Sequence, residues 1–176
     1  MAYITLESGD IISEPTTLVQ FLTNHGIFYE YWDPSVLSDR LQHGLDLSDQ
    51  EKESVFECFQ SDLERLSEQH GYTSHDMIIL SATTTPNLEE LLTNFQREHH
   101  HTEDEVRFIV DGEGVFTLTR NDERFGITVT PGDLISVPYG TRHYFTLTDK
   151  RHVKAIRLFQ SKEGWTAIYD KDVSAS

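Results

Sequence analysis

Apolar and polar positions follow two different periods along this chain, and the change falls near residue 98. Before it, three segments space their apolar side chains by three and four residues, the period of an amphipathic helix. The first predicted helix begins at Pro15 and stops at Gly26, and the second runs from Ser48 to a stop at Gly71. The third begins at Pro86 and ends close to Glu98. The second of these opens on a capping box, Ser48 with Glu51. Between the helices, residues 2–7, 27–32 and 77–80 have the composition of strands.

After residue 101, short β-rich runs recur with turn residues between them. The predicted strands are 106–110, 115–119, 126–129, 134–137, 144–147, 153–159 and 165–169. This rhythm is typical of an all-β sandwich or barrel. We therefore expect a mainly β protein with a single domain over residues 1–176. Residues 1–97 would form an N-terminal elaboration of strands and about three helices, 98–170 the β core and 171–176 a tail.

Charge narrows the classes of partner. The 176 residues carry 30 acidic and 14 basic side chains, which gives a formal net charge of −16. Such a surface repels nucleic acids and anionic membranes, so neither is an expected partner, and it favours a monomer. No apolar stretch is long enough to cross a bilayer, and the first residues lack the basic and apolar regions of a secretory signal. We therefore expect a cytoplasmic protein.

Several residues of types that often carry chemistry are expected to be structural. Cys58 is the single cysteine, which excludes an intramolecular disulfide, and its apolar neighbours within a predicted helix favour a small buried side chain. Trp32 and Trp165 are expected to pack in or beside the core. Histidines that lie near turns and helix ends are expected at the surface: His25, His43, His70, His75 and His152.

The segment 98–108 concentrates histidines and carboxylates immediately before an apolar run. In one continuous strand, residues two apart share a face, so His99, His101, Glu105 and Arg107 would all point to one side. His100 would point the other way and lie exposed or outside the immediate site. The plain alternative is a solvated charged face, since a His-rich tract indicates metal binding only when geometry supports it.

A second informative stretch runs from Gly132 to His143. Pro138 and Gly140 set a tight bend just before His143, which starts a new strand with Phe145 on the same face. Combined with the first stretch, this histidine is a candidate fourth metal ligand. Three imidazoles and one carboxylate suit a divalent first-row metal such as Fe(II), Ni(II), Mn(II), Co(II) or Zn(II), and they leave adjacent positions open on a six-coordinate ion.

Both stretches resemble the signatures of the cupin superfamily. The first has the spacing His99-x-His101-x3-Glu105-x6-Gly112, and the second has Gly132-x5-Pro138-x-Gly140-x2-His143. Two positions depart from the usual pattern: Thr93 stands in place of the opening glycine of the first signature, and Leu147 in place of the asparagine that follows the last histidine. Neither departure removes a ligand position. The resemblance implies a double-stranded β-helix, or jelly-roll barrel, in a specialised branch of the superfamily.

Within that superfamily, the whole chain is similar to the acireductone dioxygenases of methionine salvage. The most specific parts are His-x-His followed by Glu-Asp-Glu-Val-Arg-Phe at 103–108, and Leu-Ile-Ser-Val-Pro at 134–138; the match includes Glu163-Gly164-Trp165. By analogy, one Fe(2+) or Ni(2+) per chain would be bound by His99, His101, Glu105 and His143. Arg107 would be the catalytic residue that holds the anionic substrate, and Phe95 and Phe145 would wall the pocket.

The resemblance also implies a reaction. Acireductone, 1,2-dihydroxy-3-keto-5-methylthiopentene, would bind as a chelate and react with O2. The iron form would give formate and 2-keto-4-methylthiobutyrate, and the nickel form CO, formate and 3-methylthiopropionate. Two alternatives stay open: a cupin dioxygenase for another enol or thiol, and a non-catalytic cupin that binds a small acid or sugar as a sensor or storage module. The pairing of Arg107 with an open metal site weighs against the second alternative.

Overall fold

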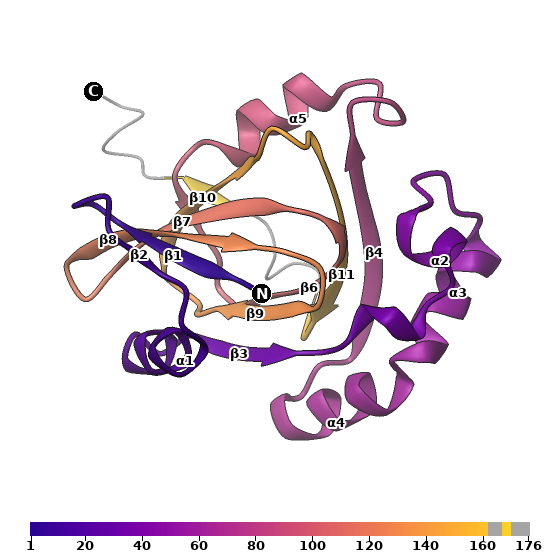
Figure 1. The fold of residues 1–176 in the computed structure, drawn as a ribbon, viewed down its shortest axis with the longest axis horizontal. Helices are drawn as coiled ribbons and strands as arrows, with labels where there is room; N and C mark the ends of the chain where they lie inside the picture. Colours follow the sequence, from indigo (N-terminus) through magenta and orange to yellow (C-terminus); the bar gives the residue numbers. More distant parts are fainter. Residues whose placement is uncertain (162–166, 170–176) are drawn as a thin grey trace.

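The computed structural model describes residues 1–161 and 167–169, which form two antiparallel β-sheets with helices around them (Figure 1). The seven-stranded sheet has the order β12 (Ile168–Tyr169), β5 (His99–His100), β10 (Arg142–Leu147), β7 (Gly114–Arg120), β8 (Glu123–Val129), β1 (Tyr3–Leu6) and β2 (Ile11–Ile12). The five-stranded sheet has the order β3 (Phe28–Tyr31), β9 (Asp133–Val137), β6 (Glu105–Gly112), β11 (His152–Phe159) and β4 (Ser74–Ser81). The prediction of a mainly β, double-sheet barrel is confirmed.

The main hydrophobic core joins the two sheets. Buried side chains from strands of both sheets share it, among them Ile109, Phe116, Ile127, Ile135 and Ala155. Apolar side chains repeat at alternate positions along these strands, so each strand turns one face to this core. The filled interior fixes the strands on which the candidate site is built.

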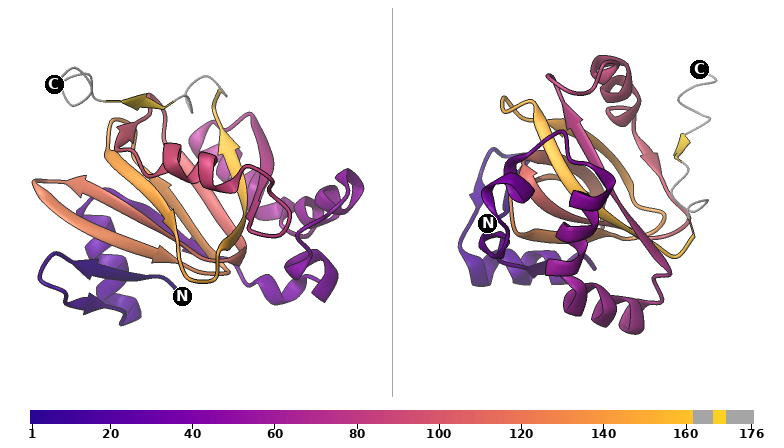
Figure 2. Two further views of the ribbon diagram at one scale, coloured as in Figure 1. Left: turned by 90° about the horizontal axis from the view of Figure 1, so that it is seen from above. Right: turned by 90° about the vertical axis from the view of Figure 1, so that its right-hand side faces the viewer.

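A second core lies on the other face of the five-stranded sheet. Val106, Phe108 and Val110 of β6 pack there against α3 (Asp49–Cys58) and α4 (Gln60–His70), which lie beside the sheet in both views of Figure 2. Strand β6 is therefore buried on both faces. Its alternate positions, Glu105 and Arg107, point away from the helices and into the barrel.

Three more helices cover other parts of the barrel. In Figure 1, α1 (Pro15–Asn24) lies beside β3, and α5 (Leu88–Phe95) lies near β10 at the top. The third, α2 (Asp39–His43), follows the short 3-10 helix η1 (Pro34–Val36). The predictions of α1 and α5 are confirmed, although α5 begins at Leu88 and not at Pro86. Elements as short as η1, α2 and β2 lie outside the predictions, because they show no period.

The prediction of one helix over residues 48–71 is wrong, because α3 and α4 meet at a bend at Phe59. This residue leaves helical geometry, with φ −114° and ψ 18°. Its ring is buried against Trp32 and Phe108, at centroid distances of 6.0 and 4.8 Å. The apolar spacing continues across the bend, so the period alone does not reveal it.

The predicted ends of this helical region are confirmed. The Ser48 hydroxyl accepts from the backbone N–H of Glu51, and the Glu51 carboxylate accepts from that of Ser48, so the capping box is complete. Gly71 ends α4 in the left-handed conformation, with φ +76°. A residue without a Cβ adopts this conformation at no steric cost.

Two burial predictions are wrong. Cys58 is exposed, because it lies two residues past buried Phe56, on the opposite face of α3. His25 is buried at the end of α1, where its ring stacks on Phe21 at 4.1 Å between centroids. The prediction that Trp32 belongs to the core is confirmed, whereas Trp165 lies outside the described residues. Of the other histidines predicted at the surface, His43, His70 and His75 are exposed, and His152 is half-buried.

Strands that precede residue 98 belong to both sheets. β1 pairs with β8, β3 pairs with β9, and β4 pairs with β11, all antiparallel. The first 97 residues therefore build part of the barrel wall as well as the helices outside it. Among residues 1–161 and 167–169, no helix is long and apolar enough to cross a membrane.

Candidate metal centre

The candidate ligands come from both sheets. His99 on β5 pairs directly with His143 on β10 in the seven-stranded sheet. Glu105 begins β6 in the five-stranded sheet, where it pairs with Val137 of β9. His101 lies in the linker 101–104 between β5 and β6. The expectation that the first three ligands ride on one continuous strand is therefore wrong, because the chain leaves one sheet and enters the other between His100 and Glu105.

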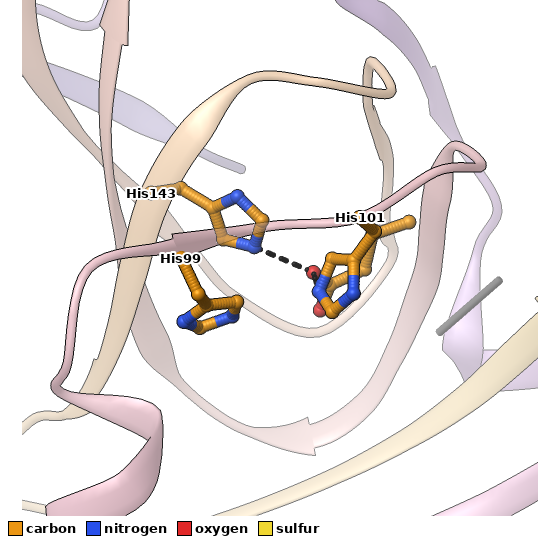
Figure 3. A group of neighbouring side chains, drawn as sticks. His99, His101 and His143 are labelled. Carbon is orange, nitrogen blue, oxygen red and sulfur yellow. Dashed lines mark hydrogen bonds and ion pairs between the residues drawn. The ribbon is translucent and has the colours of Figure 1, made fainter. Parts of the chain in front are cut away.

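The four side chains nevertheless converge on one point. One potential ligand atom from each of His99, His101, Glu105 and His143 lies within 4.8 Å of all the others, and all four residues are buried. Figure 3 shows the three imidazoles around a common centre, with a dashed line from His143 to the carboxylate. This Nε2–Oε2 distance is 2.7 Å, and His101 Nε2 lies 3.0 Å from the same oxygen. The solvated-face alternative is excluded for these residues.

Backbone carbonyls orient two of the imidazoles. Nδ1 of His99 lies 2.6 Å from the carbonyl oxygen of Arg97, and Nδ1 of His143 lies 2.8 Å from that of Thr141. A carbonyl only accepts, so in each ring Nδ1 carries a proton and Nε2 points inward. This arrangement is typical of metal-binding histidines, whose second nitrogen fixes the ring's tautomer and direction. Burial lowers the pKa of His143, but the charge and hydrogen bond of Glu105 outweigh it and raise that pKa, so Nε2 of His143 donates to the carboxylate until a metal ion displaces its proton.

Burial and charge oppose each other at these groups. Burial lowers the pKa of His99 to about 4, so its imidazole is neutral at pH 7. Burial raises the pKa of Glu105, but the charge of Arg107 and the contacts with His143 and His101 outweigh it and hold that pKa well below its usual range. An ionised carboxylate and a neutral imidazole are the forms that bind a metal ion. Three nitrogen donors and one oxygen donor, with no sulfur, fit a divalent transition metal.

Arg107 lies beside the group of four. Its Nη2 is 2.9 Å from Glu105 Oε1, and both side chains are almost fully buried. Burial lowers the pKa of Arg107, but a guanidinium keeps its proton at any physiological pH. The Arg107 guanidinium also lies over the ring of Phe145, with 5.3 Å from Cζ to the centroid. A fixed positive charge therefore faces the candidate ligands.

A cavity of about 110 Å³ opens on the candidate ligands and on Arg107. Phe95 and Phe145, both selected from the sequence, line it, and their rings meet edge to face at 6.5 Å. Asn94, Arg157 and Tyr169 also line it and were not singled out in the sequence. Arg157 pairs with Arg107 across β11 and β6. Only this strand pairing, which the sequence does not specify, would have revealed it. His100 is not among the four candidate ligands; it is half-buried and pairs with Ile168.

Comparisons with known proteins agree with this geometry. Residues 38–167 match the sequence profile of the ARD/ARD′ family. An acireductone dioxygenase of Bacillus pumilus is 47% identical over 167 residues, which cover 94% of each chain. An acireductone dioxygenase of Exiguobacterium sibiricum is 51% identical over 86% of this chain and 85% of its own.

The fold has a solved counterpart. The structure of acireductone dioxygenase from Bacillus anthracis with a cadmium ion in its active centre superimposes with a TM-score of 0.93 at 46% identity, over 96% of this chain and 98% of that one. Sequence and structure therefore agree over nearly the whole length. The chain belongs to the ARD/ARD′ family, the acireductone dioxygenases.

Proposed function

We propose that this protein is a metal-dependent dioxygenase that cleaves acireductone with O2 in methionine salvage. The observation that carries the proposal is the buried group of three imidazoles and one carboxylate, with a fixed guanidinium beside it, at the end of a small cavity. Family membership identifies the substrate, because the relatives that match over most of the chain are named acireductone dioxygenases. The formal net charge of −16 supports a monomer, and the cytoplasm is the compartment that we expect.

Within this proposal, His99, His101, Glu105 and His143 hold one Fe(II) or Ni(II) ion per chain. When bound, such an ion supplies a Lewis acid and a template for a substrate that chelates through two oxygens. The hydrogen bonds from His99 and His143 to backbone carbonyls keep Nε2 of each ring directed inward. The carboxylate of Glu105 supplies the negative charge of the ligand set.

Arg107 is the residue that acts on the substrate's charge. An acireductone bound as an ene-diolate would be an anion, and a buried guanidinium would stabilise such an anion far better than a solvated one. Because Glu105 and the ring of Phe145 hold Arg107 in place, its positive charge is in position before the substrate arrives. Phe95 and Phe145 line the same cavity with apolar surface, and a lower local dielectric constant would strengthen this interaction.

The products depend on the metal in this proposal. With iron, the expected products are formate and 2-keto-4-methylthiobutyrate. With nickel, they are CO, formate and 3-methylthiopropionate. The donor set accepts either ion, and affinity alone does not choose between them in a cell.

The test is oxygen uptake with acireductone, together with metal content, for Glu105→Ala and His101→Ala. Both variants should lose bound metal and oxygen uptake, because each removes a ligand from a set of four. His75→Ala is the matched control. His75 is an exposed histidine that contacts the ring of Phe56 and is not one of the candidate ligands. Wild-type rates in both ligand variants would refute the proposal. Binding of acireductone by the wild type without oxygen uptake would favour a non-catalytic cupin.

A further inference from the structure

The turn at residues 138–141 joins β9 to β10. It makes hydrogen bonds with two candidate ligands, His101 and His143, and with the neighbour of a third. The backbone N–H of Gly140 donates to the carbonyl of His101 at 2.8 Å. The N–H of Tyr139 donates to the carboxylate of Asp104, the neighbour of Glu105, at 2.9 Å. The carbonyl of Thr141 accepts from Nδ1 of His143 at 2.8 Å. The position of this turn therefore fixes the linker that carries His101 and the ring of His143 at once.

One side chain anchors the turn to the rest of the barrel. Arg120, at the end of β7, donates through Nη1 to the hydroxyl of Thr141 at 3.3 Å and through Nε to the carbonyl of His25 at 3.0 Å. Thr141 and His25 are both buried. His25 is itself held, because its ring stacks on Phe21 and its Nδ1 lies 2.8 Å from the Phe21 carbonyl. The guanidinium thus links the end of α1 to the turn.

The local sequence leaves room for this link. Gly26, next to His25, has φ +72°, and a Cβ built there would lie 3.1 Å from Nη2 of Arg120. Gly140 has φ +73°, which lets the turn present two successive N–H groups, from Tyr139 and Gly140, to the 101–104 linker. Arg120, Thr141 and His25 are not among the residues that line the cavity beside the ligands.

We propose that Arg120 is a positioning residue for the metal centre: it fixes the 138–141 turn through Thr141, and the turn fixes His101 and the ring of His143. This inference rests on the proposed function, because it requires that the four-residue group binds a metal ion. Arginine suits the position because its planar fork reaches two acceptors in different directions, whereas lysine offers a single point charge. Loss of partners outside the ligand set costs about 10- to 100-fold in metal affinity in other proteins.

The experiment measures the dissociation constant of Co(II), by competition with a chromogenic chelator, and the visible absorption bands of the bound Co(II). The variants are Arg120→Met, Thr141→Val, the double variant and Arg120→Lys. Arg40→Met is the matched control, because Arg40 on α2 donates to Glu51 of α3 and to Asp46 between these two helices, and not to the turn.

We expect about tenfold weaker Co(II) binding and shifted bands in Arg120→Met and in Thr141→Val. The double variant should bind no more weakly than the worse single variant, because both changes remove the same link. Arg120→Lys should recover only part of the affinity, and Arg40→Met should bind within about twofold of the wild type. Thr141→Val removes one hydroxyl group and tests the link by itself if Arg120→Met does not fold.

Unchanged affinity and bands in Thr141→Val, or fully additive losses in the double variant, would overturn the role of Arg120. An equal loss in Arg40→Met would also overturn it, since general destabilisation would then explain the effect. If the wild type itself binds no Co(II), the proposed metal centre fails, and this result is distinct from failure of the positioning role.

Discussion

Replacing Arg107 by methionine tests how charge is balanced inside the barrel. Arg107 and Glu105 are 4% and 3% exposed, and Nη2 lies 2.9 Å from Oε1. At an effective dielectric constant of about 20, their attraction is worth about 6 kcal/mol. Removing one partner of a buried pair costs about 3–5 kcal/mol, because the other charge stays buried. His101 and His143 also contact the carboxylate, so we expect the lower end, about 3 kcal/mol, for Arg107→Met without metal.

A bound divalent cation would supply positive charge to the same carboxylate. We therefore expect Arg107→Met to lose at least about 1 kcal/mol less in the metal-saturated protein than in the metal-free one. Urea unfolding, with chelator and with saturating Ni(II), measures both values, provided that the slope with denaturant stays constant.

Arg65→Met is the control for this comparison, because Arg65 pairs with Glu30 at the surface, where both side chains are partly exposed. It should cost about 1 kcal/mol or less, with or without metal. A cost of Arg107→Met no larger than that of Arg65→Met in the metal-free protein would contradict the buried-charge explanation. A cost of Arg107→Met that metal leaves unchanged would contradict it as well.

Two further predictions concern stability. Gly112 and Gly71 both have positive φ, but a Cβ at Gly112 would clash with the backbone carbonyl of His152, whereas a Cβ at Gly71 would meet nothing closer than 3.9 Å. Gly71→Ala should therefore cost about 1 kcal/mol and Gly112→Ala at least about 1 kcal/mol more in chemical denaturation, and equal costs would contradict the crowding. The ammonium of Lys154 is buried and donates to two backbone carbonyls, and burial lowers its pKa to about 8. The pKa of lysine in an unfolded chain is higher, near 10.4. Between about pH 8 and 10 the unfolded chain therefore binds more protons than the folded protein, and the free energy of unfolding rises with pH. The difference in this free energy between the wild type and Lys154→Met should rise by up to about 1.4 kcal/mol per pH unit over that interval. Parallel stability curves for the two proteins over that interval would disprove the lowered pKa.

The spacing in the sequence selects the four candidate ligands that converge in the structure, although the expectation that they share one strand is wrong. His99 and Glu105 share parity but lie in different sheets, because their pairing partners are His143 and Val137. Strand pairing of this kind depends on residues far away in the chain, so a local period cannot predict it. Arg157 was not predicted as a cavity residue for the same reason, because the pairing of β11 with β6 brings it to the cavity.

Local signals predict the ends of elements better than their interiors. The capping box at Ser48 and the left-handed stop at Gly71 lie where the sequence places them, since both depend on neighbouring residues alone. The bend at Phe59 depends on tertiary packing against Trp32 and Phe108, and the helical period continues through it. The exposure of Cys58, in the same region, was also not predicted, because apolar neighbours in the sequence do not say which face of a helix is buried.

Product identification, after metal-free protein is loaded with Fe(II) or with Ni(II) and given acireductone under O2, tests the proposed dioxygenase activity most directly. We predict one ion per chain and oxygen uptake with either metal. Iron should give formate with 2-keto-4-methylthiobutyrate, and nickel should give CO, formate and 3-methylthiopropionate. Full metal loading and acireductone binding without oxygen uptake for either metal would contradict the proposed activity.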